Sequence, residues 1–274
     1  MKKQILQKIF RMNSSFSILY FLPIILLLAC KGDNQNEPQN KKASENKISS
    51  AYIIQKAIEY SGKEKIKDNK VTFEFRNKTY ISDRVCNHFH LTRIDSSNQI
   101  KDVFYKDEIK RRIKGKSVSL ADTTSSNIKS SINSVHYFVH LPYRLKDPAV
   151  QAQRLKNDTI NDQAYYQLQV KFKEDGGGED HQDIYHYWFD QEDFSLDYLA
   201  YKFYTNDGGM RFRAKRVEKR FNGIVFQDYD NFKPTSDTLQ MDELITAYQN
   251  NQMEKVSEIV TTPISISPSK HDCD

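Results

Sequence analysis

The sequence lacks the features that mark several large classes of protein. Its longest apolar run, residues 16–28, covers about 13 positions, whereas a helix that spans a bilayer needs about 20. It contains no Gly-x-Ser-x-Gly motif, no phosphate-binding loop and no dinucleotide-binding fingerprint. Net positive charge is small outside residues 1–29, because that segment accounts for four of the five net positive charges. A near-neutral body argues against a nucleic-acid binder.

The N-terminus contains the pattern of an export signal. A basic region precedes the apolar run, and the segment ends in Leu-Leu-Ala-Cys at residues 27–30. This ending resembles a bacterial lipobox, which implies cleavage before Cys30 and acylation of that residue. Several acyl chains hold a protein on a membrane almost irreversibly. Lys31 follows where the enteric retention rule has Asp, so resemblance to that rule implies the outer membrane, with the body facing the periplasm or the cell surface.

These signals divide the chain into four parts. We expect a signal peptide over residues 1–29, a lipidated cysteine and tether over 30–47, one domain over 48–260 and a loose tail over 261–274. The polar tether has a reach of roughly 20–25 Å. Cys86 and Cys273 could pair in an oxidising compartment, but the unpaired state is favoured because Cys273 sits at the polar C-terminus.

The pattern of the body predicts an α+β fold that is mostly β. Strict alternation in Val71–Arg76 is typical of a strand, and similar short runs follow as far as Leu120. No βαβ rhythm occurs. After residue 163 the chain reads as an antiparallel meander, with turn signals at residues 174–180, 206–209 and 222–223. We therefore predict a strongly curved antiparallel sheet, or half β-barrel.

Helices are expected at three places. Ser49–Ser61 has a capping serine, an apolar stripe and Gly62 as a stop signal. Asp122–Val139 repeats its apolar residues at helical spacing and interrupts the strands. A C-terminal helical pattern starts after Ser236 and extends to Ile259. The proline-bounded segment 141–150 is too apolar for an idle loop, and we expect it to close over one mouth of the sheet.

The register of the meander follows from its turns. If Asp207-Gly208 is a two-residue turn, Phe203 faces Phe212 and Tyr201 faces Ala214. These four residues would then share the inner face. A turn at Asn222-Gly223 places Val217 opposite Asp228 and Lys215 opposite Asp230.

Two resemblances follow from this organisation. The order of strands and helices behind a lipid anchor resembles the half-barrel of the bacterial lipoprotein-localisation carriers, which implies a curved sheet that holds acyl chains beneath a helical lid. Several local strings resemble a family of uncharacterised lipoproteins from Bacteroidetes-type bacteria, over about residues 50–260. These strings are Asn133-Ser134-Val135, Tyr137-Phe138, Leu141-Pro142-Tyr143, Asp147–Val150, Gly176–Asp180, Tyr187-Trp188, Tyr198–Tyr201, Gly208–Arg213 and Asp228-Tyr229. Membership in that family implies no established activity.

Apolar residues of the meander, the central helix and the segment after it are the candidates for binding a lipid or another hydrophobic small molecule. A curved sheet leaves one concave face, which a helix or such a ligand can fill. The candidates are Tyr137, Phe138, Leu141, Tyr143, Trp188, Tyr201, Phe203, Met210 and Phe212.

Arg211, Arg213 and Asp228 are candidates for a polar rim. The two arginines project from one strand face, and they could bind an anionic headgroup at the cavity mouth. The alternative is a ladder of ion pairs with Asp228 and Asp230 on the neighbouring strand.

Two groups of residues contain side chains that can bind metals, but neither has the spacing of a known metal-binding motif. His136 and His140 are spaced to chelate Zn²⁺, but the string lacks the glutamate of a metalloprotease motif. The acidic loop at residues 174–183 offers carboxylates, but not at EF-hand spacing. We expect no metal and no cofactor, and assign no catalytic residue.

Three functional hypotheses remain open. The first is a lipid-anchored binding module, which predicts a cavity of several hundred Å³. The second is an envelope enzyme with Asp228, Asp147 or His136 in the same concavity. The third is an assembly or scaffold protein, which predicts a packed interior and an exposed apolar patch.

Overall fold

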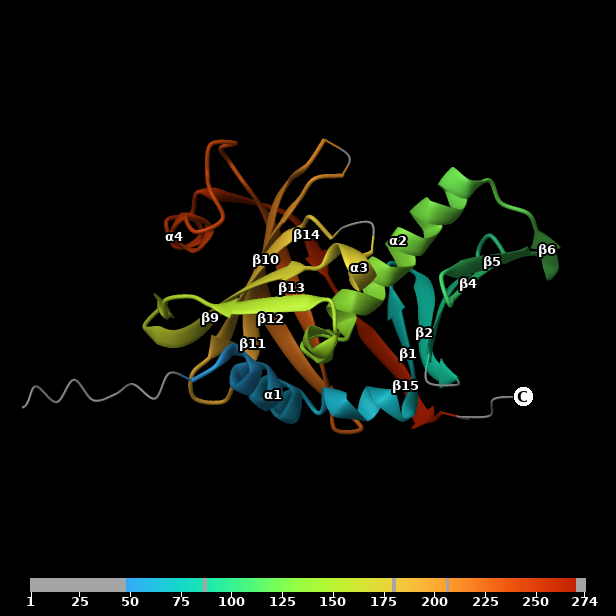
Figure 1. Ribbon diagram of the computed structural model, residues 1–274, viewed down its shortest axis with the longest axis horizontal. Coiled ribbons are helices and arrows are strands. Elements are labelled where there is room, and N and C mark those ends of the chain that lie inside the picture. Colours follow the sequence, from blue (N-terminus) through green and yellow to red (C-terminus); the bar gives the residue numbers. More distant parts are fainter. Residues whose placement is uncertain (1–47, 86–87, 179–180, 206, 270–274) are drawn as a thin grey trace, which may run out of the picture. The chain divides into compact units, whose positions relative to one another are not determined.

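Two antiparallel sheets form the body of the protein in the structure, which is a computed structural model (Figure 1). It describes residues 48–85, 88–178, 181–205 and 207–269. The predicted signal peptide, Cys30 and the tether lie outside the described residues, and so do Cys86 and Cys273.

The first sheet contains the N-terminal strands and the last strand of the chain, in the order β15-β1-β2-β3-β4-β5-β6. The strands are β1 (Asn69–Phe75), β2 (Lys78–Val85), β3 (His88–Asp95), β4 (Ile100–Tyr105), β5 (Glu108–Ile113), β6 (Lys116–Val118) and β15 (Thr262–Pro268). Tight turns join most of these strands. Both residues of the turns Arg76-Asn77, Lys106-Asp107 and Lys114-Gly115 have positive φ, which suits the twist of a two-residue hairpin.

The second sheet contains the meander, in the order β14-β13-β12-β11-β10-β9-β7, and β8 pairs with β9. Its strands are β7 (Val150–Arg154), β8 (Asp158–Ile160), β9 (Gln163–Phe172), β10 (Ile184–Asp190), β11 (Leu196–Phe203), β12 (Gly209–Phe221), β13 (Ile224–Pro234) and β14 (Met253–Ile259). The sheets curve, and in the described part of the chain no ladder joins the outer strands β6 and β7. The predicted class, a mostly β, curved and open antiparallel fold with helices, is confirmed.

The chain passes from one sheet to the other between β14 and β15. The backbone N–H of Thr261 donates to Oδ1 of Asp228 at 2.9 Å, and Nζ of Lys219 pairs with Oδ2 of the same carboxylate at 2.7 Å. Asp228 is buried. It therefore fixes the crossing point and takes no part in a polar rim.

This crossing corrects two predictions about the C-terminus. The predicted helix after Ser236 is confirmed only as the short α4 (Leu244–Gln249), because residues 253–259 form β14 on β13. The tail that we expected to be loose forms β15, which pairs with β1 over residues 262–268.

The first helix, α1 (Ser50–Ser61), forms as predicted and is followed by the 3-10 helix η1 (Lys63–Lys67). The backbone N–H of Tyr52 donates to the side chain of Ser49, which caps the helix. Gly62 ends it at φ +64°, and a Cβ there would lie 1.9 Å from the carbonyl oxygen of Gly223. The apolar stripe of α1 packs on the second sheet, with the tyrosines and leucines of β9 and β11.

The central helix, α2 (Asp122–Val139), contacts both sheets (Figure 1). Ile128 and Ile132 pack beside Leu91 of the first sheet, whereas Tyr137 packs among the aromatic residues of the second sheet. The 3-10 helix η2 (Tyr143–Lys146) follows, and a short helical segment α3 (Glu174–Gly177) lies between β9 and β10.

The register between β11 and β12 differs from the prediction. Phe203 pairs with Gly209 and Tyr201 pairs with Arg211, because the connection spans residues 204–208 rather than two residues. The shift moves the two strands by an odd number of residues, so it reverses the face of one strand relative to the other. The predicted inner face of Phe203, Phe212, Tyr201 and Ala214 is therefore wrong.

The β12–β13 register is confirmed in part. Val217 pairs with Asp228 as expected, but Lys215 pairs with Tyr229 because of a bulge between Lys215 and Val217.

Candidate ligand-binding cavities beside the central helix

Two cavities flank α2, with volumes of about 690 Å³ and about 530 Å³. Ser134 and Phe138 of α2 line both of them. The larger one lies between α2, β4, η2, α3 and the ends of β9 and β10, and we call it the aromatic cavity. The smaller one lies between α2, the end of β1 and strands β11 to β14, and we call it the arginine cavity.

Aromatic side chains from four elements meet in the aromatic cavity. Its lining includes Phe104 of β4, Tyr137 and Phe138 of α2, Phe172 of β9 and Tyr185 of β10. Ring centroids lie 5.9 Å apart for Tyr137 and Phe172, and 5.7 Å apart for Phe172 and Tyr185. Edge-to-face packing of this kind holds the rings in place.

The hydroxyl of Tyr137 is used inside the protein. It lies 2.7 Å from the hydroxyl of Tyr187, in a buried hydrogen bond. Burial raises the pKa of Tyr137 above its usual value, so the hydroxyl stays protonated at neutral pH. The ring therefore offers its apolar surface to the cavity, and its polar end is already satisfied.

Four charged groups at the edge of the aromatic cavity form two ion pairs. Nε of Arg144 donates to Asp147 at 2.6 Å, and Nζ of Lys129 pairs with Asp107 at 2.9 Å. Leu145 is buried beneath this edge and anchors the segment 141–150. The segment thus borders the cavity, through Arg144, Asp147 and Ala149.

The arginine cavity is lined by residues of a different character. Arg211 and Arg213 of β12 line it together with Tyr201 of β11. Neither arginine forms an ion pair with Asp228 or Asp230, whose described partners are Lys219, Lys255 and Arg216. The predicted ladder of ion pairs is therefore absent from the described residues, and the arginines face the cavity.

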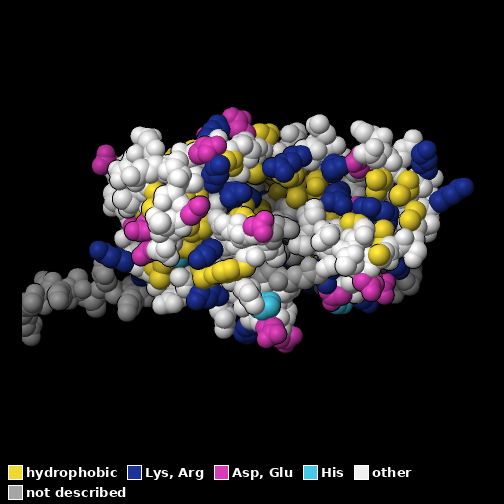
Figure 2. Space-filling model, turned by 90° about the horizontal axis from the view of Figure 1, so that it is seen from above, with side chains coloured by type: hydrophobic (Ala, Val, Ile, Leu, Met, Phe, Trp, Pro, Cys, Tyr) yellow, Lys and Arg dark blue, Asp and Glu magenta, His cyan; other side chains and the backbone are white. Residues whose placement is uncertain are grey.

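Figure 2 shows one face of the molecule, on which exposed hydrophobic side chains lie among Lys and Arg side chains. Asp and Glu side chains lie on the same face.

The structure brings only some of the predicted binding residues to the cavities. Tyr137, Phe138 and Tyr201 line them, and Leu141 lines a gap of about 30 Å³ behind them. Tyr143 packs between two core clusters, and Phe203 packs beside Tyr201 and Arg211.

Trp188, Met210 and Phe212 lie elsewhere. They belong to the core on the opposite face of the second sheet, which α4 and the segment before it cover. Phe212 stacks 4.8 Å from Tyr248 of α4. Their assignment to the concave face is wrong, because alternate residues of β10 and β12 point away from it.

Sequence reasoning missed several residues of the aromatic cavity. Phe172 and Tyr185 end one strand and begin the next, on either side of the acidic loop, and Phe104 comes from the other sheet. Alternation along the strands assigns Phe172 and Tyr185 to a face. No sequence signal brings Phe104 to them, because that contact depends on how the two sheets approach each other.

The predicted histidine pair lies in the hydrophobic core. His136 and His140 are both buried, with ring centroids 5.7 Å apart, and His136 packs on Phe73 and Tyr80. Burial lowers the pKa of His136 to about 3. Among the described residues, no group of three or more His, Cys, Asp or Glu side chains is arranged to hold a metal.

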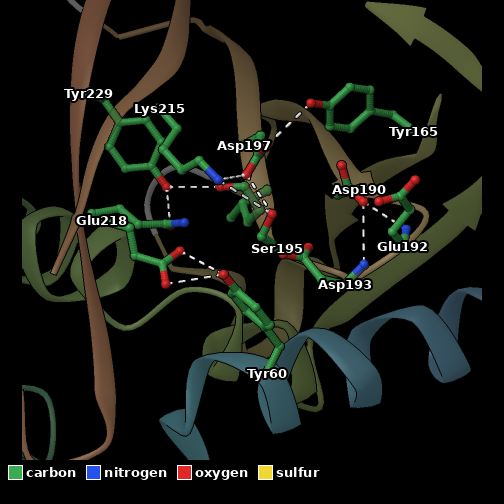
Figure 3. A network of polar contacts seen from close by, with 12 residues as sticks. Tyr60, Tyr165, Asp190, Glu192, Asp193, Ser195, Asp197, Lys215, Glu218 and Tyr229 are labelled. Atoms are coloured by element: carbon green, nitrogen blue, oxygen red, sulfur yellow. Dashed lines mark hydrogen bonds and ion pairs between the residues drawn. The ribbon is translucent and has the colours of Figure 1, made fainter. Parts of the chain in front are cut away.

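A second polar cluster lies near α1 and contains Ser195, Asp197 and Lys215 (Figure 3). Oγ of Ser195 donates to Asp197 at 2.7 Å, and Lys215 forms an ion pair with the same carboxylate. The hydroxyl of Tyr165 donates to it at 3.2 Å. Ser195 donates its hydroxyl proton to a carboxylate and lines neither cavity. We therefore assign this cluster a structural role, which is to stabilise the β10–β11 turn.

No helix among the described residues is long and apolar enough to cross a membrane.

Several solved structures are similar in fold. A LolA superfamily protein from Nitrosomonas europaea is 12% identical, with a TM-score of 0.45, covering 82% of this chain and 95% of that chain. A domain from Vibrio parahaemolyticus described as outer membrane lipoprotein-sorting is 12% identical, with a TM-score of 0.41, covering 78% and 91%. A DUF1329 family protein from Desulfovibrio piger is 6% identical, with a TM-score of 0.44, covering 80% and 92%. At this level of similarity, none of them assigns a ligand to this chain.

Among curated proteins, none matches this chain. The comparison with protein families is more specific, because one match spans the central helix, the residues that line both cavities and nearly all of the strands. Residues 41–261 match it, and the chain belongs to DUF6503, a family of unknown function.

Proposed function

We propose that this protein is a membrane-anchored lipoprotein of the cell envelope that binds a hydrophobic ligand, such as an acyl chain, beside α2. The observation that carries the proposal is the aromatic cavity of about 690 Å³. Its volume falls in the range of about 300–1,000 Å³ that is usual for small-molecule sites. Its lining of aromatic rings favours an apolar occupant, because the hydroxyl of Tyr137 and the Arg144–Asp147 and Lys129–Asp107 ion pairs are already satisfied inside the protein.

The paired charges at the cavity edge argue for binding rather than catalysis. Asp147 and Asp228, two of the candidates for an enzymatic role, face the cations of Arg144 and Lys219. The third, His136, is 0% exposed in the core. A general base must reach the proton that it abstracts, and none of these three groups is placed to do so.

The cavities also argue against a scaffold role. That hypothesis expects a packed interior, whereas open space flanks α2 on both sides. A lipid anchor at Cys30 fits the binding proposal, because the polar tether predicted for residues 31–47 would hold the domain near a membrane. The anchor and the outer-membrane location both rest on the sequence.

The anchor predicts that the substitution Cys30→Ser releases the protein. The wild-type chain, expressed in a Gram-negative host, should partition into the detergent phase of a Triton X-114 extraction, because acyl chains bind membranes strongly. The C30S variant should move to the aqueous phase, or stay as a precursor with its signal segment. Equal partition of both proteins, with the same N-terminus by mass spectrometry, would rule out lipidation at Cys30.

The cavity predicts that Asn133→Trp blocks ligand binding. Asn133 lies on α2 and lines the aromatic cavity but not the arginine cavity. An indole at this position therefore fills space that the ligand needs. Binding of 1-dodecanol to the delipidated full chain, measured by isothermal titration calorimetry, should weaken about 10-fold or more.

Asn127→Trp is the matched control, since Asn127 is exposed on the same helix and lines no described cavity. It should bind 1-dodecanol like the wild type. If N133W folds and still binds with wild-type affinity, the aromatic cavity is not the site.

A further inference from the structure

The guanidinium of Arg213 is buried without a carboxylate partner among the described residues. Only 7% of the residue is exposed. The carboxylates on the neighbouring strand, Asp228 and Asp230, form ion pairs with other cations. Nη2 donates to the hydroxyl of Tyr201 at 3.2 Å. Nε is buried and has no hydrogen-bond partner in the described part of the chain.

Aromatic rings compensate for part of this burial. The guanidinium carbon lies 3.8 Å from the ring centroid of Phe138 and 5.3 Å from that of Tyr201. Such stacking offsets some of the lost hydration of a cation. Stacking uses the faces of the guanidinium and not its in-plane N–H donors, which bind a carboxylate or phosphate in a bidentate fashion. One of these donors is bound to Tyr201, and Nε has no partner among the described residues.

The rest of the arginine cavity has the same electrostatic character. Arg76 and Arg211 also line it, and no Asp or Glu is among its lining residues. Nη1 of Arg211 donates to the carbonyl of Met210, so part of its guanidinium is already used. Three guanidinium groups without a carboxylate among them make the cavity attractive to anions.

Asn231 adds a second polar group that lacks a partner. It is buried, its Nδ2 donates to Ser257 at 3.1 Å, and its Oδ1 has no partner among the described residues. Because the hydroxyl of Ser257 can donate as well as accept, the amide can turn and present its NH₂ to the cavity. Both Asn231 and Ser257 line the arginine cavity.

We propose that the arginine cavity binds the anionic group of the ligand, a carboxylate or a phosphate, through Arg213. This inference rests on the proposed function and names the class of ligand: an anionic amphiphile. Val135, Val139 and Ile259 line the same cavity and can contact the first part of its chain. Phe138 lines both cavities and stacks on Arg213, so the anionic group and the aromatic cavity lie on either side of one ring.

The test compares three probes with the same chain length: 1-dodecanol, dodecanoate and dodecyl phosphate. Binding to the delipidated full chain is measured by isothermal titration calorimetry at pH 8. At least one anion should bind about 10-fold or more tightly than 1-dodecanol, because a hydrogen bond to a charged group contributes more than a neutral one. The stronger anion then tells a carboxylate ligand from a phosphate ligand.

Arg213→Gln should remove this preference and leave the affinity for 1-dodecanol within about threefold of the wild type. Arg213→Lys keeps the charge without the bidentate geometry, and should retain part of the preference. Arg220→Gln is the matched control, because Arg220 lies on the same strand and lines neither cavity. It should behave like the wild type.

A measurement on the wild type alone guards against a variant that fails to fold. Raising NaCl from 50 to 500 mM should weaken binding of the anions and leave 1-dodecanol unchanged, since salt screens charge. If 1-dodecanol binds as tightly as both anions, or if folded R213Q keeps the preference, this inference is wrong while the proposed function stands. If none of the probes binds, both are wrong.

Discussion

Replacing Asp102 with alanine is expected to lower the free energy of unfolding by about 3 kcal/mol. Asp102 lies in the middle of β4 and is 1% exposed. Its carboxylate binds Nη2 of Arg93 on β3 at 2.8 Å and Nε of Arg111 on β5 at 2.7 Å. The alanine variant keeps two partly buried cations and removes the anion between them.

The same cluster holds α2 on the first sheet. Nη1 of Arg93 donates to Ser131 of α2 at 3.0 Å, so the position of this guanidinium affects the helix that forms both cavities. We therefore expect D102A to lose ligand affinity as well as stability. Urea denaturation monitored by circular dichroism measures the stability change.

Asp107→Ala provides the matched control for this prediction. Asp107 forms an ion pair with Lys129 of the same helix, but its side chain is 85% exposed. Its loss should cost less than about 1 kcal/mol, because exposed ion pairs contribute little. If D102A and D107A lower the free energy of unfolding equally, the buried cluster stabilises the fold no more than the exposed ion pair does.

The pH dependence gives a second check on Asp102. Burial raises the pKa of this carboxyl, but hydrogen bonds from Arg111 and Arg93 outweigh that effect and hold its pKa below the usual 3.8. A carboxyl with a lowered pKa stabilises the fold above its unfolded pKa, and that contribution is lost as the pH falls through the folded pKa. The stability difference between wild type and D102A should therefore narrow below about pH 4.

The strands of the first sheet could be predicted because local chemistry decides them. Val71 and Phe73 alternate with polar residues, and both are buried on one face. Turns such as Lys114-Gly115 need only local conformations to close a hairpin. The helices α1 and α2 follow from their caps and apolar stripes for the same reason.

The register of the meander could not be obtained in this way. Sequence shows that Asp207 and Gly208 favour a turn, but not that the connection begins after Phe203. One odd shift changes which arginines and aromatic residues share a face. From the sequence, Arg213 could be assigned to an ion pair with the neighbouring strand or to a cavity mouth, and the structure places it at the cavity.

The end of the chain shows how a short apolar pattern can mislead. Met253, Val256 and Ile259 recur at helical spacing, yet they lie in β14 because β13 offers free hydrogen-bonding groups along its edge. Val256 is 39% exposed, so this apolar residue does not belong to the buried face of a helix. Pairing between distant segments overrides a weak local signal here.

The protein is expected to gain stability as the pH rises from about 7 to 9, and Lys63→Met should abolish that gain. Lys63 begins η1 and is 2% exposed. Its Nζ donates to the carbonyl of Val139 at the end of α2 and lies 4.5 Å from the ring centroid of Phe226. Desolvation by burial lowers its pKa from 10.5 to about 7.

The sign follows from proton binding. Between the folded pKa of about 7 and the unfolded value of 10.5, the unfolded chain holds a proton that the folded protein has released. The contribution of Lys63 to stability therefore rises with pH across this window, by at most about 1.4 kcal/mol per pH unit. Near pH 10 the buried tyrosines, whose pKa values are raised by burial, begin to act in the opposite direction. Below pH 7 both states are protonated, so the cost of burying the charge is fully present.

Desolvation lowers the pKa of Lys63, and no carboxylate among the described residues offsets this effect. His140 lies close enough to Lys63 for the two groups to interact. Burial, His136 and Lys63 together lower the pKa of His140 well below its usual value, so His140 is neutral. A neutral His140 cannot compensate for a charged lysine, so the ammonium is destabilised by its surroundings.

Urea denaturation at several pH values between 7 and 9 measures the slope of unfolding free energy against pH for wild type and K63M. The comparison uses the slope, because methionine also leaves the Val139 carbonyl without its donor and so shifts the stability at every pH. Lys65→Met is the matched control, since Lys65 is exposed in the same 3-10 helix. K65M should keep the wild-type slope, and an equal slope in K63M would show that Lys63 stays charged in the folded protein.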